Sequence, residues 1–336
     1  MSKINIKEIF DSFNNFNIII IGDVMIDSYM WGKVSRISPE APVPIISSTH
    51  QENRLGGAAN VALNVQALGA NAILCSVIGN DAKAHTFNSL LKKRKLSQEG
   101  IVEDKSRKTT VKTRIISDNQ HLIRVDEEID TELNSEVEKI LIDRIKKIIL
   151  SRNIDAIIFE DYDKGCITTK VIDEIVKIAN RKNIVTLVDP KKRNFNNYKN
   201  VTLFKPNFKE LVEGMKSEIA KDDFNGIFEI GKKLQKKLST EIILVTLSEL
   251  GVFVSSNNSY KIVPAEIRDI ADVSGAGDTM ISIASLCLAA KLKAADIATI
   301  SNIAGGLVCE KIGVAPVEKK YLLEECLKKF QEQNME

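Results

Sequence analysis

A short run of small residues near the C-terminal end has the composition of an anion-binding turn. Gly275, Ala276 and Gly277 precede the acid Asp278, and an apolar stretch follows directly. A helix that begins after such a turn offers free N–H groups and a positive dipole end, which favour phosphate. Asp278 could then take a proton from an alcohol while the N–H groups face a transferred phosphoryl group. An acid at a helix N-terminus is also a common cap, and this segment alone does not separate the two roles.

A second small-residue segment, RLGGAANVALNVQALGA, occupies residues 54–70. Gly56 and Gly57 would let a ligand approach the backbone closely, and Asn60 offers a donor and an acceptor to sugar hydroxyls. Taken alone, this segment could equally be a close helix–strand contact. The stretch GIFEIGKK at 226–233 only approximates a P-loop, because Lys233 stands where a magnesium-binding hydroxyl belongs. Its period is helical, so we predict an ordinary amphipathic helix there.

Alternating strand and helix patterns predict the elements that position these segments. Helical periodicity is clear at 134–150 and 169–183. Continuous apolar runs, which suit strands covered on both faces, occur at 17–23, 71–79, 155–161, 183–190, 201–207 and 241–248. The pattern predicts an α/β fold with a mostly parallel sheet, whose functional residues gather at the carboxyl ends of the strands. Polar residues end several of the runs: Asp23, Asp161, Asp189, Asn207 and Ser248.

Two segments depart from this alternation. Residues 28–55 contain three prolines and no helix signal, and residues 108–128 alternate like antiparallel strands around a turn at Asp118–Asn119. We interpret them as a small β lid inserted in two pieces. The prediction is therefore one domain over 1–336 with a lid formed by about 28–55 and 108–128.

Bulk composition excludes several classes of protein. The net charge of +2 lacks the one-sided basicity of a nucleic-acid binder. The 5 cysteines are far apart and have no metal-ligand spacing, which indicates buried free thiols in a reducing compartment. The N-terminal apolar segment is too short to span a bilayer. We therefore expect a cytoplasmic protein with neither nucleic acid nor membrane as a partner.

Together the two glycine segments resemble the paired signatures of the ribokinase-like (PfkB-type) sugar kinases, over about residues 15 to 315. The resemblance implies a three-layer α/β/α fold, with ATP and Mg²⁺ as cofactors and K⁺ as a further candidate. It implies Asp278 as the catalytic base, with Gly275, Ala276 and Gly277 forming the anion hole. Asn207 and Glu210, in KPNFKEL, would organise magnesium, in part through water, and Asp272 with Ser274 would help to hold a monovalent cation. The implied nucleotide contacts are Asn207, Thr246, Ser248, Gly251, Gly275, Gly277, Asn302 and Gly305.

A narrower set of strings resembles one branch of that family, which phosphorylates D-glycero-D-manno-heptose 7-phosphate at the anomeric oxygen. SRISPEAPVP at 35–44 is the most specific, and GGAANVALNVQALGA, EDYDKG and LVDPKK agree with it. The resemblance implies a pathway that makes nucleotide-activated heptose for lipopolysaccharide core or another surface glycan. The candidate acceptor contacts are Asp27, Arg36, Gly56, Gly57, Asn60, Arg114, Arg124, Lys164 and Lys191. Each basic residue could instead be an ordinary surface residue, and Asp27 an ordinary turn residue.

Kinases of this branch are often fused to a nucleotidyltransferase with a His-x-Gly-His signature. The only histidines here are His50, His85 and His121, and none forms that signature. We therefore expect either a stand-alone kinase, with a separate nucleotidyltransferase acting later in the pathway, or the kinase portion of a longer protein. Relatives commonly dimerise through the lid, and the apolar VPII at 43–46 is compatible with a homodimer. The alternatives are another PfkB-type kinase, for ribose, fructose or a similar sugar, and a non-catalytic sugar-phosphate sensor.

Overall fold

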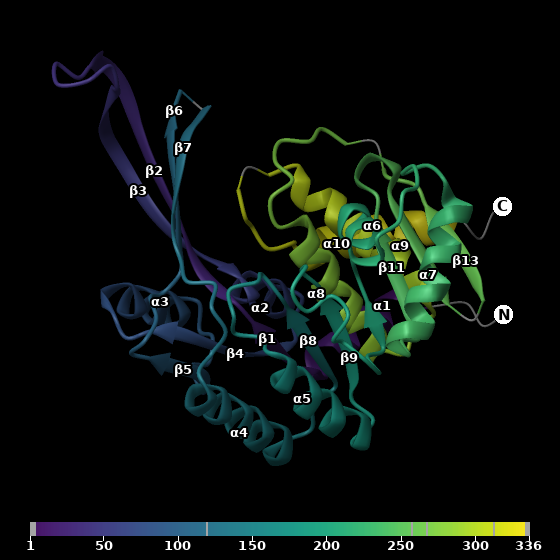
Figure 1. The fold of residues 1–336 in the computed structure, drawn as a ribbon. Coiled ribbons are helices and arrows are strands. Elements are labelled where there is room, and N and C mark those ends of the chain that lie inside the picture. Colours follow the sequence, from purple (N-terminus) through teal and green to yellow (C-terminus); the bar gives the residue numbers. More distant parts are fainter. Residues whose placement is uncertain (1–4, 119, 257, 267, 312, 333–336) are drawn as a thin grey trace.

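Two sheets organise the chain, whose computed structural model describes residues 5–332 apart from 119, 257, 267 and 312. A nine-stranded sheet lies between two layers of helices, and a four-stranded sheet rises from one end of it (Figure 1). The first sheet is mostly parallel and the second mostly antiparallel. This arrangement confirms the predicted three-layer α/β/α class with a small additional β sheet.

The main sheet follows the order β13-β12-β11-β10-β9-β8-β1-β4-β5. Its strands are β1 (Asn17–Gly22), β4 (Asn71–Gly79), β5 (Gly100–Asp104), β8 (Ala156–Glu160), β9 (Val185–Asp189), β10 (Leu203–Phe204), β11 (Ile242–Thr246), β12 (Val252–Ser256) and β13 (Ser259–Val263). Neighbours from β5 to β11 pair in parallel, whereas β12 and β13 are antiparallel additions at one edge. Each of the six apolar runs forms a strand, as predicted, because helices cover both faces of the sheet.

The two helical layers bury opposite faces of β1. Ile18 and Ile20 point into one core and Ile19 and Ile21 into the other, as the two-residue repeat of a strand requires. The first core is closed by α1 (Ile6–Ser12), α2 (Ala58–Ala67), α3 (Ala82–Lys93), α8 (Ala276–Ala289), α9 (Ala294–Cys309) and α10 (Lys319–Glu332). The second is closed by α4 (Ser135–Ser151), α5 (Thr169–Arg181), α6 (Phe208–Met215) and α7 (Phe224–Leu238). Short 3-10 turns lie at Phe13–Asn15 and Ser248–Leu250.

The four-stranded sheet, with order β3-β2-β6-β7, is assembled from two distant parts of the chain. Its strands are β2 (Val24–Ile37), β3 (Pro44–Gly57), β6 (Val111–Ser117) and β7 (Gln120–Glu127). Only Asp23 separates β1 from β2, and pairing already begins between Val24 and Gly57, slightly beyond the predicted 28–55. The β2–β3 hairpin projects well beyond the helical body (Figure 1). Asn119, at the predicted turn between β6 and β7, lies outside the described residues.

Three smaller sequence predictions also concern the fold. All five cysteines are buried and free. The stretch 226–233 lies inside the amphipathic helix α7, whose buried face includes Ile227, Ile230 and Leu234, and it is no phosphate loop. Within the described part of the chain, no helix is long and apolar enough to cross a bilayer.

Candidate active site

The N-terminal end of α8 carries the proposed base. Gly275 caps the helix with φ +82, a left-handed conformation that favours glycine, and Asp278 lies in the first turn. The first turn of a helix leaves backbone donors without intrahelical partners, and Gly277 and Asp278 belong to it. The N–H of Ala276 already donates to the Val273 carbonyl at 3.3 Å. This end of α8 can therefore receive an anion mainly through the two later N–H groups.

Two side chains from other elements hold the Asp278 carboxylate. Asn60 Nδ2, on α2, donates to Asp278 Oδ2 at 2.7 Å, and the Tyr162 hydroxyl donates to Oδ1 at 2.8 Å. Asp278 is only 6% exposed, and this burial raises its pKa above 3.8. An ionised carboxylate has about four lone-pair positions, so each oxygen can still accept a proton from a substrate hydroxyl.

A buried group of charges adjoins this carboxylate at the ends of β8, β9 and β10. Lys205 Nζ lies 2.6 Å from Asp189 Oδ2. A Cβ added at Gly277 would be 3.6 Å from both of those atoms, so the ion pair lies directly beside the helix start. Glu160 is buried nearby, and its Oε2 has no hydrogen-bond partner among the described residues. Burial and the carboxylates of Asp189 and Asp278 raise the pKa of Glu160 well above 4.5.

The base of the small sheet brings Asp27 close to the glycine segment. Asp27, on β2, accepts a hydrogen bond from Arg114 Nη1 on the adjacent strand β6 at 2.5 Å. A Cβ at Gly56 would collide with the Asp27 carboxylate, which explains glycine at that position. Gly57 has φ +60 and caps α2, so it turns the chain from β3 into the helix that carries Asn60.

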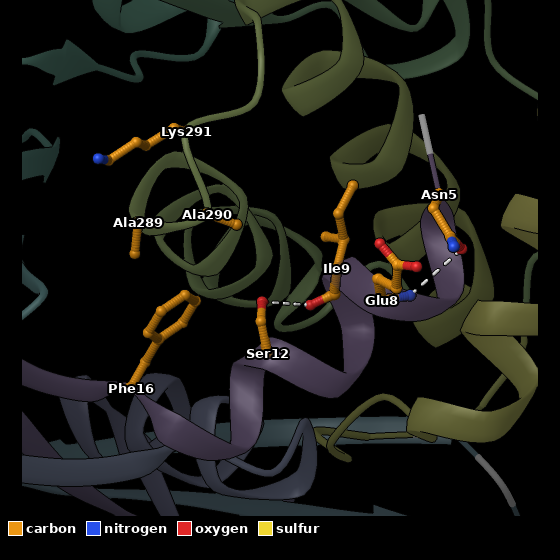
Figure 2. A pocket seen from close by; sticks show the side chains of 8 residues that line it. All are labelled: Asn5, Glu8, Ile9, Ser12, Phe16, Ala289, Ala290 and Lys291. Atoms are coloured by element: carbon orange, nitrogen blue, oxygen red, sulfur yellow. Dashed lines mark hydrogen bonds between the residues drawn. The ribbon is translucent and has the colours of Figure 1, made fainter. Parts of the chain in front are cut away.

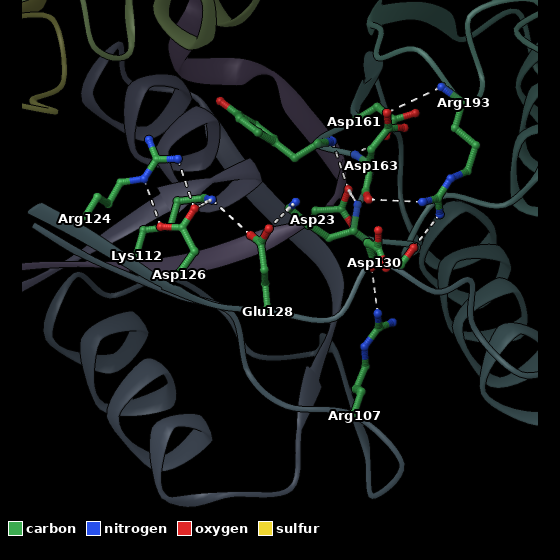
Figure 3. A network of polar contacts seen from close by, with 12 residues as sticks. Asp23, Arg107, Lys112, Arg124, Asp126, Glu128, Asp130, Asp161, Asp163 and Arg193 are labelled. Carbon is green, nitrogen blue, oxygen red and sulfur yellow. Dashed lines mark hydrogen bonds and ion pairs between the residues drawn. The ribbon is translucent and has the colours of Figure 1, made fainter.

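A chain of ion pairs connects the small sheet to the loop after β8 (Figure 3). Lys112 contacts Asp126 and Glu128 at 2.9 and 3.0 Å, and Lys164 contacts Glu128 at 2.7 Å. Arg124 contacts Asp126 at 2.9 Å, with its side chain 57% exposed. Predicted phosphate contacts Arg124 and Lys164 thus lie in one network, each already paired with an acid.

The Asn-x-x-Glu spacing of 207–210 forms a capping box at the start of α6. Asn207 Oδ1 accepts from the Glu210 N–H, and Glu210 Oε2 accepts from the Asn207 N–H, both at 2.8 Å. The other Glu210 oxygen contacts Lys191 Nζ at 2.5 Å. Among the described residues, no group of three His, Cys, Asp or Glu is arranged to hold a metal. The side-chain oxygens of Asn207 and Glu210 fit a Mg²⁺ ion that keeps most of its water ligands and is also bound by phosphate oxygens.

Besides Gly275 and Gly277 at the start of α8, the predicted nucleotide residues lie after the ends of β10 and β11 and along α9. Thr246 ends β11 and pairs with Asn207, while Ser248 and Gly251 form the following turn with φ +53 and +90. Asn302 Nδ2 donates to the Pro264 carbonyl at 2.9 Å. A Cβ at Gly305 would lie 2.8 Å from Met280 Cγ. Gly305 therefore permits close packing of α9 on α8, a structural role that the sequence did not indicate.

Asp272 links two loops beside the anion turn. Its Oδ1 accepts from the Ser274 N–H and its Oδ2 from the Gly313 N–H, both at 2.9 Å. Both oxygens keep lone pairs, so a cation contact is compatible with these bonds. In the structure itself, the Asp272 carboxylate joins the loop at 272–274 to Gly313 through these two hydrogen bonds.

Comparison with known sequences decides the family. The profile of the pfkB family of carbohydrate kinases matches residues 15–320. The chain belongs to the pfkB family of carbohydrate kinases. It is accordingly an ATP-dependent sugar kinase, and Asp278 occupies the turn that the sequence pattern indicated.

Several relatives can be aligned with about nine-tenths of this pfkB-family chain. Bifunctional protein HldE of Aliarcobacter butzleri is 38% identical over 299 residues, which cover 89% of this chain and 62% of that protein. Its counterpart from Helicobacter acinonychis is 38% identical, with coverage of 89% and 64%. That from Pelobacter propionicus is 35% identical, with coverage of 95% and 65%. The kinase therefore spans less than two thirds of the length of these relatives.

Solved structures confirm the fold of the kinase. Phosphofructokinase-2 from Escherichia coli in complex with potassium superposes with a TM-score of 0.76 at 17% identity, covering 94% of this chain and 99% of that one. Arabidopsis thaliana ribokinase complexed with ribose and ATP gives a TM-score of 0.69 at 14% identity, covering 92% and 98%. At these identities the likeness concerns the ribokinase-like fold alone.

One predicted contact of the kinase lies away from the others. Arg36 is exposed on the distal half of the β2–β3 hairpin, opposite Ile45, whereas Asp27 lies nine positions earlier at its buried base. An open surface pocket of about 330 Å³, whose lining side chains are drawn in Figure 2, is also remote from Asp278. It lies between α1 and the C-terminal end of α8, the opposite end of that helix, and is lined by residues including Phe16, Ala289 and Lys291.

The sequence prediction missed three residues beside Asp278. Tyr162 and Glu160 belong to EDYDKG, a string that marked the heptose branch, and Lys205 begins KPNFKEL, where only Asn207 and Glu210 were singled out. Each stands at or just after the end of a parallel strand, and this position was the available signal. Which of them turns toward Asp278 depends on the order of the strands, and local sequence does not contain that order.

Proposed function

We propose that this kinase transfers the γ-phosphoryl group of ATP to O1 of D-glycero-D-manno-heptose 7-phosphate, giving heptose 1,7-bisphosphate. The observation that carries the reaction is the position of Asp278, buried at the start of α8 beside Gly277. The choice of sugar is supported by the strings shared with the heptose branch and by the similarity to the HldE proteins.

In the proposed reaction, Asp278 accepts the proton of the anomeric hydroxyl as O1 attacks the γ-phosphorus. The bond from that phosphorus to the β–γ bridging oxygen breaks, and ADP leaves with the bridging oxygen. The N–H groups of Gly277 and Asp278 would face the transferring group, and Lys205 beside them would add positive charge.

Magnesium would supply charge neutralisation on the ATP phosphates. Glu210 and Asn207 would hold it, largely through water, because their side chains also form the capping box of α6. Asp272 would support K⁺ from the loop before the anion turn. Thr246, Ser248, Gly251 and Asn302 would contact the nucleotide.

The acceptor would lie between the small sheet, acting as a lid, and the start of α8. Asp27 and Asn60 would contact sugar hydroxyls. Arg124, Lys164 and Lys191 would bind the 7-phosphate, which would take the place of the carboxylates that these residues now contact. Arg36, being on the distal hairpin, would reach an acceptor only in an assembly, and a homodimer through the lid sheet would allow this. We place the enzyme in the cytoplasm, with a nucleotidyltransferase acting later on its product.

The test is a set of sugars with and without a terminal phosphate, incubated with ATP and Mg²⁺ while ADP release is followed. Turnover restricted to heptose 7-phosphate supports the proposal, provided that ³¹P NMR shows a new phosphate at O1. Turnover with ribose, fructose or another unphosphorylated sugar instead keeps the kinase and rejects the heptose. ATP binding without turnover on any sugar favours the sensor. Asp278→Asn is the matched control and should lower turnover by about two to four orders of magnitude.

A further inference from the structure

We propose that Tyr162 is a positioning residue for Asp278, and that Asp23 sets where Tyr162 is held. The inference rests on the proposed function, because it assigns to Asp278 the role of base. It assigns a role to a residue outside both glycine segments. It also explains why an acid follows β1, because this acid fixes the loop that carries Tyr162.

The contact between Tyr162 and Asp278 joins the loop after β8 to the start of α8. The Tyr162 hydroxyl donates to Asp278 Oδ1 at 2.8 Å, and the Asn60 amide donates to the other carboxylate oxygen. Part of the Tyr162 side chain is exposed, but protein surrounds its hydroxyl, and this burial raises the pKa of the phenol well above 10. The hydroxyl therefore stays protonated and can only donate to the carboxylate.

Asp23 determines the location of the loop that carries Tyr162. Its Oδ2 accepts from the N–H groups of Tyr162 and Lys164 at 2.9 and 3.1 Å, and its Oδ1 accepts from the Cys166 N–H at 2.9 Å. Its backbone carbonyl accepts from the Ala58 N–H at 2.9 Å, at the start of the helix that carries Asn60. One residue at the end of β1 thus places both donors that hold the base.

The hydrogen bond has a chemical consequence for Asp278. Burial raises the pKa of this carboxyl, whereas the bonds from Asn60 and Tyr162 lower it by stabilising the charged form. Three charged residues lie close to this carboxyl. Asp189 on β9 raises the pKa of Asp278, and Lys205 after β10 lowers it. The third is Glu160 on β8, another buried acid. Because the ionised form accepts the proton, loss of the Tyr162 hydroxyl should move the acidic limb of activity to higher pH.

Tyr162→Phe separates this role from simple packing, because phenylalanine keeps the ring. The ring also lies 5.6 Å from Lys191 Nζ, a contact that phenylalanine preserves. Tyr198→Phe is the matched control. The Tyr198 hydroxyl donates at 2.7 Å to Asp161, a buried carboxylate of the same loop, and Tyr198 itself is fully buried. Both variants therefore lose one hydroxyl bonded to a carboxylate, but only one of them loses a bond to Asp278.

The first measurement is the pKa of Asp278, by ¹³C NMR of the full chain labelled at aspartate carboxyls, with Asp278→Asn for assignment. This readout requires no sugar. We expect Tyr162→Phe to raise this pKa and Tyr198→Phe to leave it unchanged. With the sugar that the wild type phosphorylates, kcat/KM of Tyr162→Phe should fall about ten- to a hundredfold, the loss expected for one hydrogen bond to a charged group. Its acidic limb should move to higher pH.

The outcomes distinguish the two proposals. An unchanged Asp278 pKa in Tyr162→Phe overturns the positioning role, whatever the activity. The same upward shift in Tyr198→Phe also overturns it, since any loosening of the loop would then suffice. A raised pKa with an unmoved acidic limb rejects Asp278 as the base, and with it the inference. A wild type that phosphorylates no sugar rejects the proposed function. The NMR titration then still decides whether the Tyr162 hydroxyl lowers the pKa of Asp278.

Discussion

The Lys205 ammonium lies 2.6 Å from Asp189 Oδ2, at the carboxyl ends of two neighbouring strands and almost fully enclosed. Lys205→Met should lower the free energy of unfolding by about 3–5 kcal/mol, because removing one partner leaves a buried charge uncompensated. Urea unfolding followed by circular dichroism measures this loss. Lys139→Met is the control, since Lys139 is 73% exposed in its pair with Asp143. Equal midpoints for the two variants would contradict this account.

Asp278→Asn should be more stable than the wild type at neutral pH. The folded-state pKa of Asp278 is raised above its unfolded value near 3.8. Between these two values the folded protein binds more protons, so the contribution of Asp278 to stability falls as pH rises through that window. Asparagine removes this penalty, and the gain should disappear at pH values below the unfolded pKa. Thermal unfolding over a pH series measures it, and a variant that is less stable at neutral pH would show that the carboxylate instead stabilises the fold.

Gly277→Ala and Gly275→Ala should separate catalysis from folding. A Cβ at Gly277 would make ordinary contacts, 3.6 Å from Asp189 and Lys205, but would fill the approach to the anion turn. We expect an unchanged melting temperature and a fall in kcat of about a hundredfold, typical of a displacement near 1 Å at a reacting group. Gly275 has φ +82, so alanine there should lower the melting temperature as well. Full activity in Gly277→Ala would remove this turn from the reaction.

Replacement of an apolar residue on the small sheet should disrupt the proposed homodimer. The four-stranded sheet and the adjoining hairpin tip expose Val34, Ile37, Val43, Leu122, Ile123 and Val125. Ile123→Asp would place a charge in this patch, and sedimentation velocity should show monomers where the wild type is dimeric. Leu150→Asp is the control, because Leu150 is 67% exposed but lies on α4. A wild-type monomer, or a dimer that survives Ile123→Asp, would reject the lid interface.

The sequence alone was sufficient for the class of fold and for part of the site. Continuous apolar runs predicted the buried parallel strands, and small residues before Asp278 predicted the glycine-capped start of α8. These features arise from the backbone preferences and hydrophobic periodicity of a few neighbouring residues, so a local pattern contains them. The gathering of polar strand ends also followed from parallel pairing, as Asp189 next to Lys205 illustrates.

The contacts of those residues were decided only by the tertiary structure. Asn60 and Tyr162 hold Asp278 from 218 and 116 positions away in the sequence. Their meeting depends on strand order and on the packing of α2 against α8, which no local pattern specifies. The same reason accounts for Arg36, which belongs to a predicted substrate segment but lies on the distal hairpin. Sequence determined which chemical groups were available, and long-range packing determined which of them reach the base.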